Sequence, residues 1–425
     1  MTMHRHGMMR VVAVLACLVA VLLLSLPVAA SASVRTRIDA VLAQQGLAGS
    51  GTSVAVYDLS DRCYLYSLRP DTLRLPASNE KLVTAAAALA EWSASYRFCT
   101  QLFAEPAAPD GGGVLAGDIY LRGLGDPTLS TASFQANHFG IATANLRDFV
   151  TQLQALGVAK IAGRVVADDG YFDGARTVAS WRPGMVDFCG PLSALTLNEG
   201  LGTDGAYVQD PSLWAAGKLT KMLRSAGIIV VHSAARGVVP STATLLYAEP
   251  SAQLSRILAA MNKPSDNFLA EELLKGLGAG FGGAGTTAAG ADVAERYLES
   301  IGMTKGYRLR DGSGLSYANK LSARAIIKIL SAMTRRDDFA AFWSSLAVAG
   351  VDGTLEDRMR GTPAAGNVHA KTGTLSAASC LSGYVASANR HALVFSILMN
   401  GGGLPIARAH AAQDEIAIVL AGSRP

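Results

Sequence analysis

Three short motifs, spread over most of the 425 residues, constrain this chain more than any other feature of its sequence. In chain order they are Ser78-Asn79-Glu80-Lys81, Ser265-Asp266-Asn267 and Lys371-Thr372-Gly373. A serine three residues before a lysine on a helix places a hydroxyl and an amine within reach of each other. A chain that uses all three motifs must fold so that segments far apart in sequence meet around one site.

Chance matches to these motifs are few. Lys81 alone among the lysines follows a serine by three residues, and Lys-Thr-Gly occurs once. Ser-x-Asn occurs a second time at 387–389, on a segment that reads as a hairpin turn after the third motif, and we interpret that copy as coincidence. The order of the three motifs therefore indicates one active-serine site for acyl transfer.

The first 32 residues have the composition of a secretory signal peptide. A basic start with Arg5 and Arg10 precedes an apolar run over 11–26, and small residues follow Pro27. This pattern predicts cleavage after Ala30 or Ala32, and the run is shorter than the roughly 20 residues of a spanning helix. We expect an exported protein, periplasmic or extracellular, with no stable membrane anchor after cleavage.

Charge and cysteine content narrow the function classes. The net charge of +4 falls to +2 when Arg5 and Arg10 are removed, which gives no reason to expect a nucleic-acid partner. The length suggests two domains.

Four cysteines remain after removal of the predicted signal peptide, namely Cys63, Cys99, Cys189 and Cys380. They lack the spacing of a redox or zinc pair, and the sequence does not choose among their possible disulfide pairings.

Strand patterns occur at both ends of the chain. Runs at 53–59 and 63–68, separated by a turn-prone stretch, predict a hairpin, and 369–375, 379–386 and 391–399 predict three more strands. Together they predict a five-stranded antiparallel sheet. Helices are expected at 34–45 and 81–92, and the second places Ser78 near a helix N-terminus, where free backbone amides favour negative charge.

A long insertion separates the first two motifs. Residues 98–246 carry strand and helix patterns of their own, including an expected helix at 146–156. We therefore predict a catalytic domain of 33–97 and 247–425, interrupted by an inserted mixed α/β domain of 98–246. The glycine-rich stretch 278–283 follows a helix pattern rather than a strand, so it does not fit a dinucleotide-binding turn, and we expect a loop there.

The motif residues can be given chemical roles. Ser78 is the expected nucleophile and Lys81 its base, provided that burial or a second cation keeps some of the amine neutral. Asn267 can orient Lys81 or the substrate amide, and Ser265 can pass a proton to the leaving amine. A free substrate carboxylate suits the third motif, with the charge of Lys371 and the segment Thr372, Gly373 and Thr374.

Other chemistries lack a matching pattern. No Gly-x-Ser-x-Gly elbow is present. The histidines that follow the signal region have no metal-ligand spacing, so we expect neither a metal nor a cofactor.

The chain resembles the class C low-molecular-mass penicillin-binding proteins, the D-alanyl-D-alanine carboxypeptidase/endopeptidase family. Besides the three motifs, five segments carry the resemblance: 76–79, 125–129, 191–195, 311–316 and 381–385. It implies an α/β (α+β) fold with a penicillin-recognising serine transpeptidase/β-lactamase-like domain around an insertion. It also implies a serine D-Ala-D-Ala carboxypeptidase/endopeptidase that acts on peptidoglycan stem peptides and is acylated by β-lactams.

Further residue assignments depend on the resemblance. Asp126 matches a family position near the amine of the substrate side chain, although an aspartate there can equally cap its own loop. The chain lacks a second inserted domain that relatives usually carry, and Tyr317 stands where many relatives have an arginine, which leaves side-chain selectivity open. The balance of carboxypeptidase against endopeptidase activity also stays open.

Two alternatives remain. A β-lactamase would need a group that activates water for deacylation, and the chain contains no Glu-x-x-x-Asn of the kind that class A enzymes use. A non-catalytic module that binds penicillin or peptidoglycan would have no need of Lys81 beside Ser78. Stable labelling, rapid turnover or no labelling by a penicillin separates the three cases.

Overall fold

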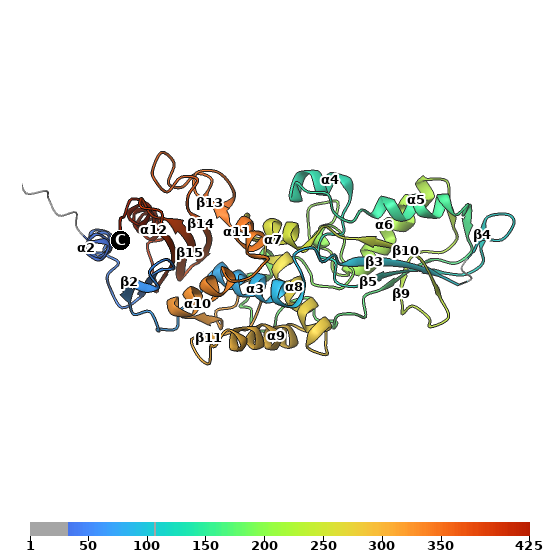
Figure 1. Cartoon of the computed structure of the whole chain (residues 1–425). Coiled ribbons are helices and arrows are strands. Elements are labelled where there is room, and N and C mark those ends of the chain that lie inside the picture. Colours follow the sequence, from blue (N-terminus) through green and yellow to red (C-terminus); the bar gives the residue numbers. More distant parts are fainter. Residues whose placement is uncertain (1–32, 106–107) are drawn as a thin grey trace, which may run out of the picture.

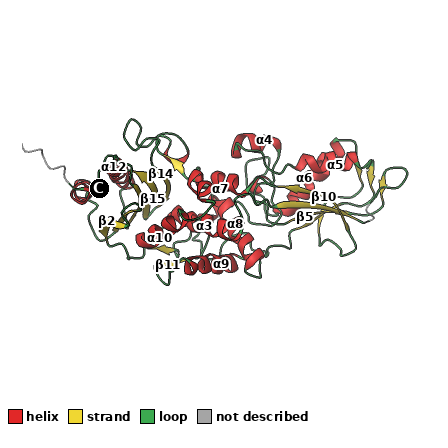
Figure 2. Ribbon diagram, in the orientation of Figure 1, coloured by secondary structure: helices red, strands yellow, loops and turns green. Residues whose placement is uncertain are grey.

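A computed structural model describes residues 33–105 and 108–425, and Figure 1 shows an elongated molecule with one sheet towards each end. The predicted signal peptide lies outside the described residues. Within the described ranges, no helix is both long enough and apolar enough to cross a membrane. Helices and strands are distributed over the whole length, as Figure 2 shows.

The first sheet is built from both ends of the chain. Its order is β13-β14-β15-β16-β1-β2, and each neighbouring pair is antiparallel. The strands are β1 (Thr52–Asp58), β2 (Cys63–Leu68), β13 (Ala347–Val348), β14 (His369–Leu375), β15 (Ala378–Ala386) and β16 (Ala392–Asn400). Five match the predicted strands. The sixth, β13, is an edge strand of two residues, too short to produce an alternating pattern in the sequence.

Helices cover both faces of this sheet. The terminal helices α2 (Val34–Gln44) and α12 (Ile406–Ala421) pack on one face. A larger core lies on the other face, and its helices are α3 (Lys81–Glu91), α7 (Leu254–Asn262), α8 (Asn267–Phe281), α9 (Thr287–Ser300), α10 (Ala323–Met333) and α11 (Phe339–Ser345). Burial on two sides explains why β15 and β16 are buried almost along their whole length.

The second sheet lies at the other end of the molecule and has the order β10-β3-β5-β7-β9. Its strands are β3 (Cys99–Ala104), β5 (Ile119–Gly123), β7 (Val165–Asp168), β9 (Ala235–Arg236) and β10 (Thr244–Pro250). The pairs β5–β7 and β7–β9 are parallel and the other two are antiparallel. We propose that this part is the inserted domain, with its end moved from 246 to about 250, because β10 runs to Pro250.

Smaller elements complete this region. Helices α5 (Leu146–Ala155) and α6 (Pro211–Ser225) contribute to a separate apolar core on the second sheet. A small parallel sheet joins β4 (Val114–Leu115), β6 (Lys160–Ile161) and β8 (Ile229–Val230). The short helices are α4 (Ala132–Phe134), η2 (Gln135–Phe139), η3 (Met185–Phe188) and η4 (Asn198–Gly200). Strands β11 (Tyr307–Arg308) and β12 (Lys320–Leu321) pair near α9 and α10.

One expectation about glycines was wrong. Gly278 and Gly280 are not in a loop, because α8 continues to Phe281. A Cβ at Gly278 would lie 2.7 Å from the backbone nitrogen of Gly290, so the missing side chain lets α8 and α9 approach closely. Tertiary packing has overridden the weak helix propensity of glycine. The four cysteines of the described chain are all free thiols.

Candidate active site

Ser78 lies on a tight turn that is enclosed by two other segments. It belongs to the short 3₁₀ helix η1 (Ala77–Glu80), which leads directly into α3. A Cβ at Gly314 would lie 1.9 Å from the carbonyl oxygen of Ala77, and one at Gly373 would lie 3.0 Å from the nitrogen of Ser78. The two glycines thus allow the 311–316 loop and strand β14 to touch the serine turn. Ala77 itself has a φ of 46°, a conformation that is uncommon for residues with a side chain.

Lys81 joins the first two motifs. Its Nζ donates to Ser78 Oγ at 3.2 Å, to Asn267 Oδ1 at 2.7 Å and to the carbonyl oxygen of Ser313 at 2.8 Å. The side chain is completely buried, whereas Ser78 is half-buried and reachable. The predicted meeting of serine, lysine and asparagine is therefore present in the structure.

Burial also prepares the amine of Lys81 for proton transfer. Desolvation lowers the pKa of Lys81 to about 8, against the opposing effect of nearby carboxylates, of which Asp266 is the strongest. A lysine with an ordinary pKa would be almost entirely protonated near neutral pH. The lowered pKa gives Lys81 a neutral fraction that can accept the proton of Ser78.

The third motif is brought to the same place by β14. Lys371 is completely buried, its Nζ donates to the carbonyl oxygen of Thr372 at 3.2 Å, and its own carbonyl oxygen accepts from Asn79 Nδ2 at 3.0 Å. Burial, with a smaller contribution from Lys81, lowers the pKa of Lys371 well below its usual value. The two lysines therefore lie close enough to affect each other's charge.

The hydroxyls of the third motif differ in their surroundings. Thr372 Oγ1 donates to Thr354 Oγ1 at 2.8 Å, and Thr374 is exposed near the end of β14. The exposed hydroxyl of Thr374 is therefore free to meet a ligand from solvent.

The second motif begins α8. Ser265 has a φ of 70°, is half-buried, and makes no hydrogen bond within the described chain. Asp266 Oδ1 caps the helix by accepting from the backbone nitrogen of Leu269 at 2.8 Å. Asn267, the first helical residue, uses its Nδ2 to donate to the carbonyl oxygen of Phe188 at 2.8 Å, so the inserted region holds the amide that contacts Lys81. The neighbouring carboxylates of Asp266 and then Glu199 raise the pKa of His138 to about 10.

Asp126 lies away from this cluster. Its side chain is buried, and its Oδ1 accepts from the backbone nitrogen and the hydroxyl of Thr128, at 2.8 and 2.7 Å. None of the contacts found in the described chain joins Asp126 to a motif residue. Its surroundings fit a loop cap, and substrate binding by Asp126 remains a prediction without support from the geometry.

The sequence did not identify the residues that fix the loop in contact with Lys81. Glu271 accepts from the backbone nitrogens of Gly312 and Ser313 at 3.1 and 2.8 Å, which fixes the loop whose carbonyl contacts Lys81. Asp311 accepts from the nitrogens of Gly314 and Ser316 at 2.8 and 2.6 Å. The segment 311–316 was noted in the sequence, but no pattern linked it to α8.

A loop of the inserted region forms one wall of the site. Trp181 Nε1 donates to Asp311 Oδ2 at 2.8 Å, and the guanidinium of Arg182 lies 3.6 Å from the ring centre of Tyr317. The hydroxyl of Tyr317 in turn lies 2.6 Å from Ser376 Oγ, just after β14. Tyr317 is therefore part of a contact between three loops at the rim, with a cation from another segment stacked on it.

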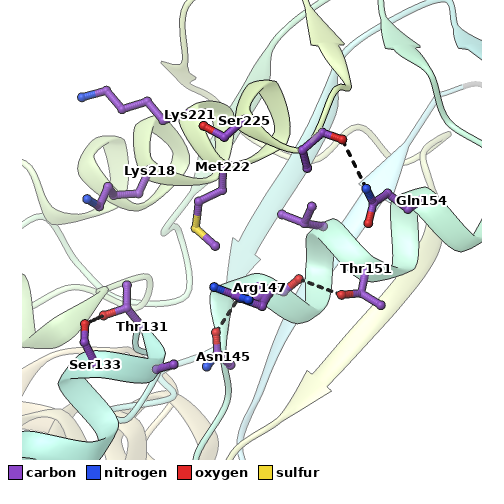
Figure 3. Close-up of a pocket in the computed structure, with 13 residues that line it drawn as sticks. Thr131, Ser133, Asn145, Arg147, Thr151, Gln154, Lys218, Lys221, Met222 and Ser225 are labelled. Carbon is purple, nitrogen blue, oxygen red and sulfur yellow. Dashed lines mark hydrogen bonds between the residues drawn. The ribbon is translucent and has the colours of Figure 1, made fainter.

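A large groove in the described chain lies elsewhere. Its volume is about 920 Å³, and none of the motif residues lines it. Figure 3 shows Arg147, Lys218 and Lys221 among the side chains that line it, between α5 and α6. The proposed site is recognised instead by the polar side chains that meet at Lys81 and by the lowered pKa values of Lys81 and Lys371.

Comparisons with known proteins show the family and the fold of the chain. Residues 34–205 and 202–422 match the D-Ala-D-Ala carboxypeptidase 3 (S13) family. The chain is 34% identical to the D-alanyl-D-alanine carboxypeptidase of an Actinomadura species, over 91% of this chain and 84% of the relative. The crystal structure of penicillin binding protein 4 from Haemophilus influenzae superposes with a TM-score of 0.74 at 21% identity, over 89% of this chain and 97% of that one. A second structure of that protein, complexed with a β-lactam, gives 0.72 at 21% identity, over 89% and 97% of the two chains.

Proposed function

Because the chain belongs to the D-Ala-D-Ala carboxypeptidase 3 (S13) family, as a class C low-molecular-mass penicillin-binding protein, we propose that it cleaves peptidoglycan stem peptides through an acyl-enzyme on Ser78. The observation that carries this proposal is the position of the Lys81 amine, 3.2 Å from Ser78 Oγ and 2.7 Å from Asn267 Oδ1. Nucleophile, base and orienting group therefore occupy the relation that nucleophilic catalysis requires.

The first half of the reaction forms the acyl-enzyme. Neutral Lys81 accepts the hydroxyl proton as Ser78 Oγ attacks the carbonyl carbon of the terminal D-Ala–D-Ala bond. Negative charge develops on the carbonyl oxygen, where the backbone N–H groups of Ser78 and Thr374 are suited to receive it, worth about 3 kcal/mol per donor in measured cases. The proton held by Lys81 then passes through Ser265 to the leaving nitrogen, the C–N bond breaks, and D-alanine departs while Lys81 becomes neutral again.

The second half returns the enzyme to its starting state. Water, giving its proton to Lys81, attacks the ester carbon, and the bond to Ser78 Oγ breaks as that oxygen regains a proton. The products are the shortened stem peptide and D-alanine.

The free carboxylate of the substrate suits the third motif. We infer that Lys371 is protonated when a carboxylate binds beside it, since a nearby negative charge favours the charged amine against the effect of burial. The hydroxyls of Thr372 and Thr374, on the same strand, supply further donors. A β-lactam presents an equivalent carboxylate beside a strained amide, so we propose that it acylates Ser78 as well. We therefore also propose that the protein is exported, because its proposed substrate, peptidoglycan, lies outside the cytoplasm; the predicted signal peptide supports this.

Mass spectrometry tests the proposal. Purified stem peptides that end in D-Ala-D-Ala, and cross-linked dimers, are incubated with the protein and with Ser78→Ala. We expect loss of one D-alanine only with the unmodified protein. In a parallel incubation with a penicillin, we expect a stable penicilloyl adduct on Ser78. Cleavage by Ser78→Ala would overturn the serine mechanism, and rapid hydrolysis of the penicillin would indicate a β-lactamase. Products from the dimers would show the share of endopeptidase activity.

A further inference from the structure

Three potential metal ligands meet beside the second motif although they are far apart in sequence. His138 Nε2 lies 3.2 Å from Glu199 Oε1 and 3.5 Å from Asp266 Oδ2. His138 comes from η2, Glu199 from η4, and Asp266 precedes α8. All three ligand atoms lie within 4.8 Å of one another.

These separations fit a single tetrahedral ion. Zinc binds imidazole nitrogen and carboxylate oxygen at about 2.0–2.2 Å. Ligands at the corners of a tetrahedron of that size are about 3.3–3.6 Å apart, since each edge is about 1.63 times the metal–ligand distance. The two distances from His138, 3.2 and 3.5 Å, lie in or next to that range. The two pairs that include His138 are therefore already at the spacing of zinc ligands, and the third pair, Glu199 and Asp266, lies within 4.8 Å.

A proton compensates the same charges less completely. The side chains of Glu199 and Asp266 are only 9% and 13% exposed, so their mutual repulsion is weakly screened by solvent. An imidazolium has one N–H at Nε2 for two carboxylates, and the longer of the two separations is a poor hydrogen bond. A divalent cation would contact both carboxylates and the ring nitrogen at once.

The ligands are held in orientation by their neighbours. The ring of His138 stacks on Phe134 with 4.6 Å between ring centres and meets the edge of Phe139. Asp266 uses Oδ1 for the helix cap and leaves Oδ2 for the cluster. The side chain of His138 is 43% exposed, which leaves solvent access for a fourth ligand.

The other cluster of this kind in the described chain fits a metal less well. Asp58 Oδ2 has its own partner in His391 Nδ1 at 2.7 Å, and Asp58 Oδ1 accepts from the backbone nitrogen of Ser60 at 2.8 Å. The side chain of Asp61 is 58% exposed, and its Oδ2 lies 3.7 Å from His391 Nδ1. Each polar atom of Asp58 is thus already satisfied, and the third carboxylate is free in solvent.

We propose that His138, Glu199 and Asp266 bind a divalent transition-metal cation, best Zn²⁺, at the edge of the acyl-transfer site. The ion ties two short helices of the inserted region to the loop that carries Ser265 and Asn267. Its role is to position that loop, and it takes no part in the acyl transfer itself. The metal site does not depend on the assignment of Ser78 as nucleophile, because its ligands are separate from the serine and the two catalytic lysines.

Calorimetric titration with ZnCl₂ tests this site. The full-length protein is first treated with a chelator and dialysed, then titrated at about pH 7.5, and its thermal midpoint is measured with and without Zn²⁺. We expect one equivalent to bind, the midpoint to rise, and His138→Ala and Glu199→Gln each to weaken binding at least about tenfold. MgCl₂ should bind more weakly, since an imidazole ligand disfavours it.

His391→Ala is the matched control, because it removes the histidine of the other cluster and should leave this binding unchanged. Absence of Zn²⁺ binding to the unmodified protein would show that the cluster is an ion pair only and would overturn the proposal. Loss of binding in His391→Ala, with binding retained in His138→Ala, would overturn it as well. Circular dichroism shows whether each variant is folded. If Glu199→Gln does not fold, His138→Ala still tests the site, because the side chain of His138 is partly exposed.

Discussion

Gly373 lies against the serine turn so closely that a Cβ added there would stand 3.0 Å from the backbone nitrogen of Ser78. The same atom would be 2.8 Å from the carbonyl oxygen of Pro76. All of the atoms that it would meet belong to the backbone, so a rotamer change cannot relieve the contact. The Lys-Thr-Gly motif therefore has a steric reason for its glycine, in addition to the chemistry of its lysine.

Gly373→Ala should separate β14 from the serine turn. We expect acylation by a fluorescent penicillin to fall at least about 100-fold, because shifts near 1 Å at a catalytic group cost that much, with a stability loss of about 1–3 kcal/mol from overpacking. Gly402→Ala is the control, since nothing lies within 4 Å of its Cβ position. Equal labelling rates for the two variants would contradict the steric explanation.

The rate of acylation should depend on pH through Lys81. Its pKa of about 8 means that the amine is mostly protonated below that pH and mostly neutral above it. Only the neutral amine accepts the proton of Ser78, so the rate should rise about tenfold per pH unit below 8 and level off above it. Stopped-flow acylation between about pH 6 and 9.5 measures this. A flat profile, or residual pH-dependent labelling in Lys81→Met, would exclude Lys81 as the base.

Glu271→Ala should damage both stability and acylation. The carboxylate accepts from the nitrogens of Gly312 and Ser313, and without it these buried donors lose their partner. We expect a loss of about 1–3 kcal/mol in urea unfolding and slower acylation, since the Ser313 carbonyl that contacts Lys81 is no longer fixed. Glu271→Gln should be milder, because the amide oxygen can still accept.

Glu272→Ala is the comparison for that experiment. Glu272 is equally buried but accepts from the nitrogen of Ser193, away from Lys81. It should cost comparable stability while acylation of the folded fraction is retained. If both variants slow acylation alike, general destabilisation rather than the 311–316 loop is responsible.

Lys371→Ala should reduce selectivity for a free carboxylate. Peptides ending in D-Ala-D-Ala are compared with the same peptides ending in an amide, and the ratio of their kcat/KM values is measured. We expect this ratio to fall at least about tenfold, because a charge-assisted contact is lost. Lys305→Ala, at an exposed lysine, is the control. An unchanged ratio in Lys371→Ala would remove the carboxylate role.

The convergence of the three motifs could be predicted because each motif is local and its chemistry requires the others. The five main strands of the first sheet also carried clear signals in their apolar runs and turns. The side-chain contacts that complete the site carried none. Glu271 and Ser313 are 42 residues apart, and nothing in their neighbourhoods marks them as partners.

The cluster of His138, Glu199 and Asp266, which we propose as a metal site, shows the same limit. We expected no metal because the histidines lack ligand spacing, and spacing is informative only when ligands share a helix or a loop. Here the fold brings together residues from three segments, and His138 and Glu199 are 61 positions apart in the sequence. Local sequence patterns cannot predict contacts that depend on the packing of the inserted region.

Strand β1 lies between β2 and β16, with Val56 opposite Phe395. Synthesis begins at the amino end, so β1 leaves the ribosome together with β2 but long before its other neighbour. One edge of the hairpin then stays unpaired until residue 400 has been made, and such an edge is prone to wrong pairing. A chain truncated before β16 would therefore leave β1 and β15 without the strand that lies between them.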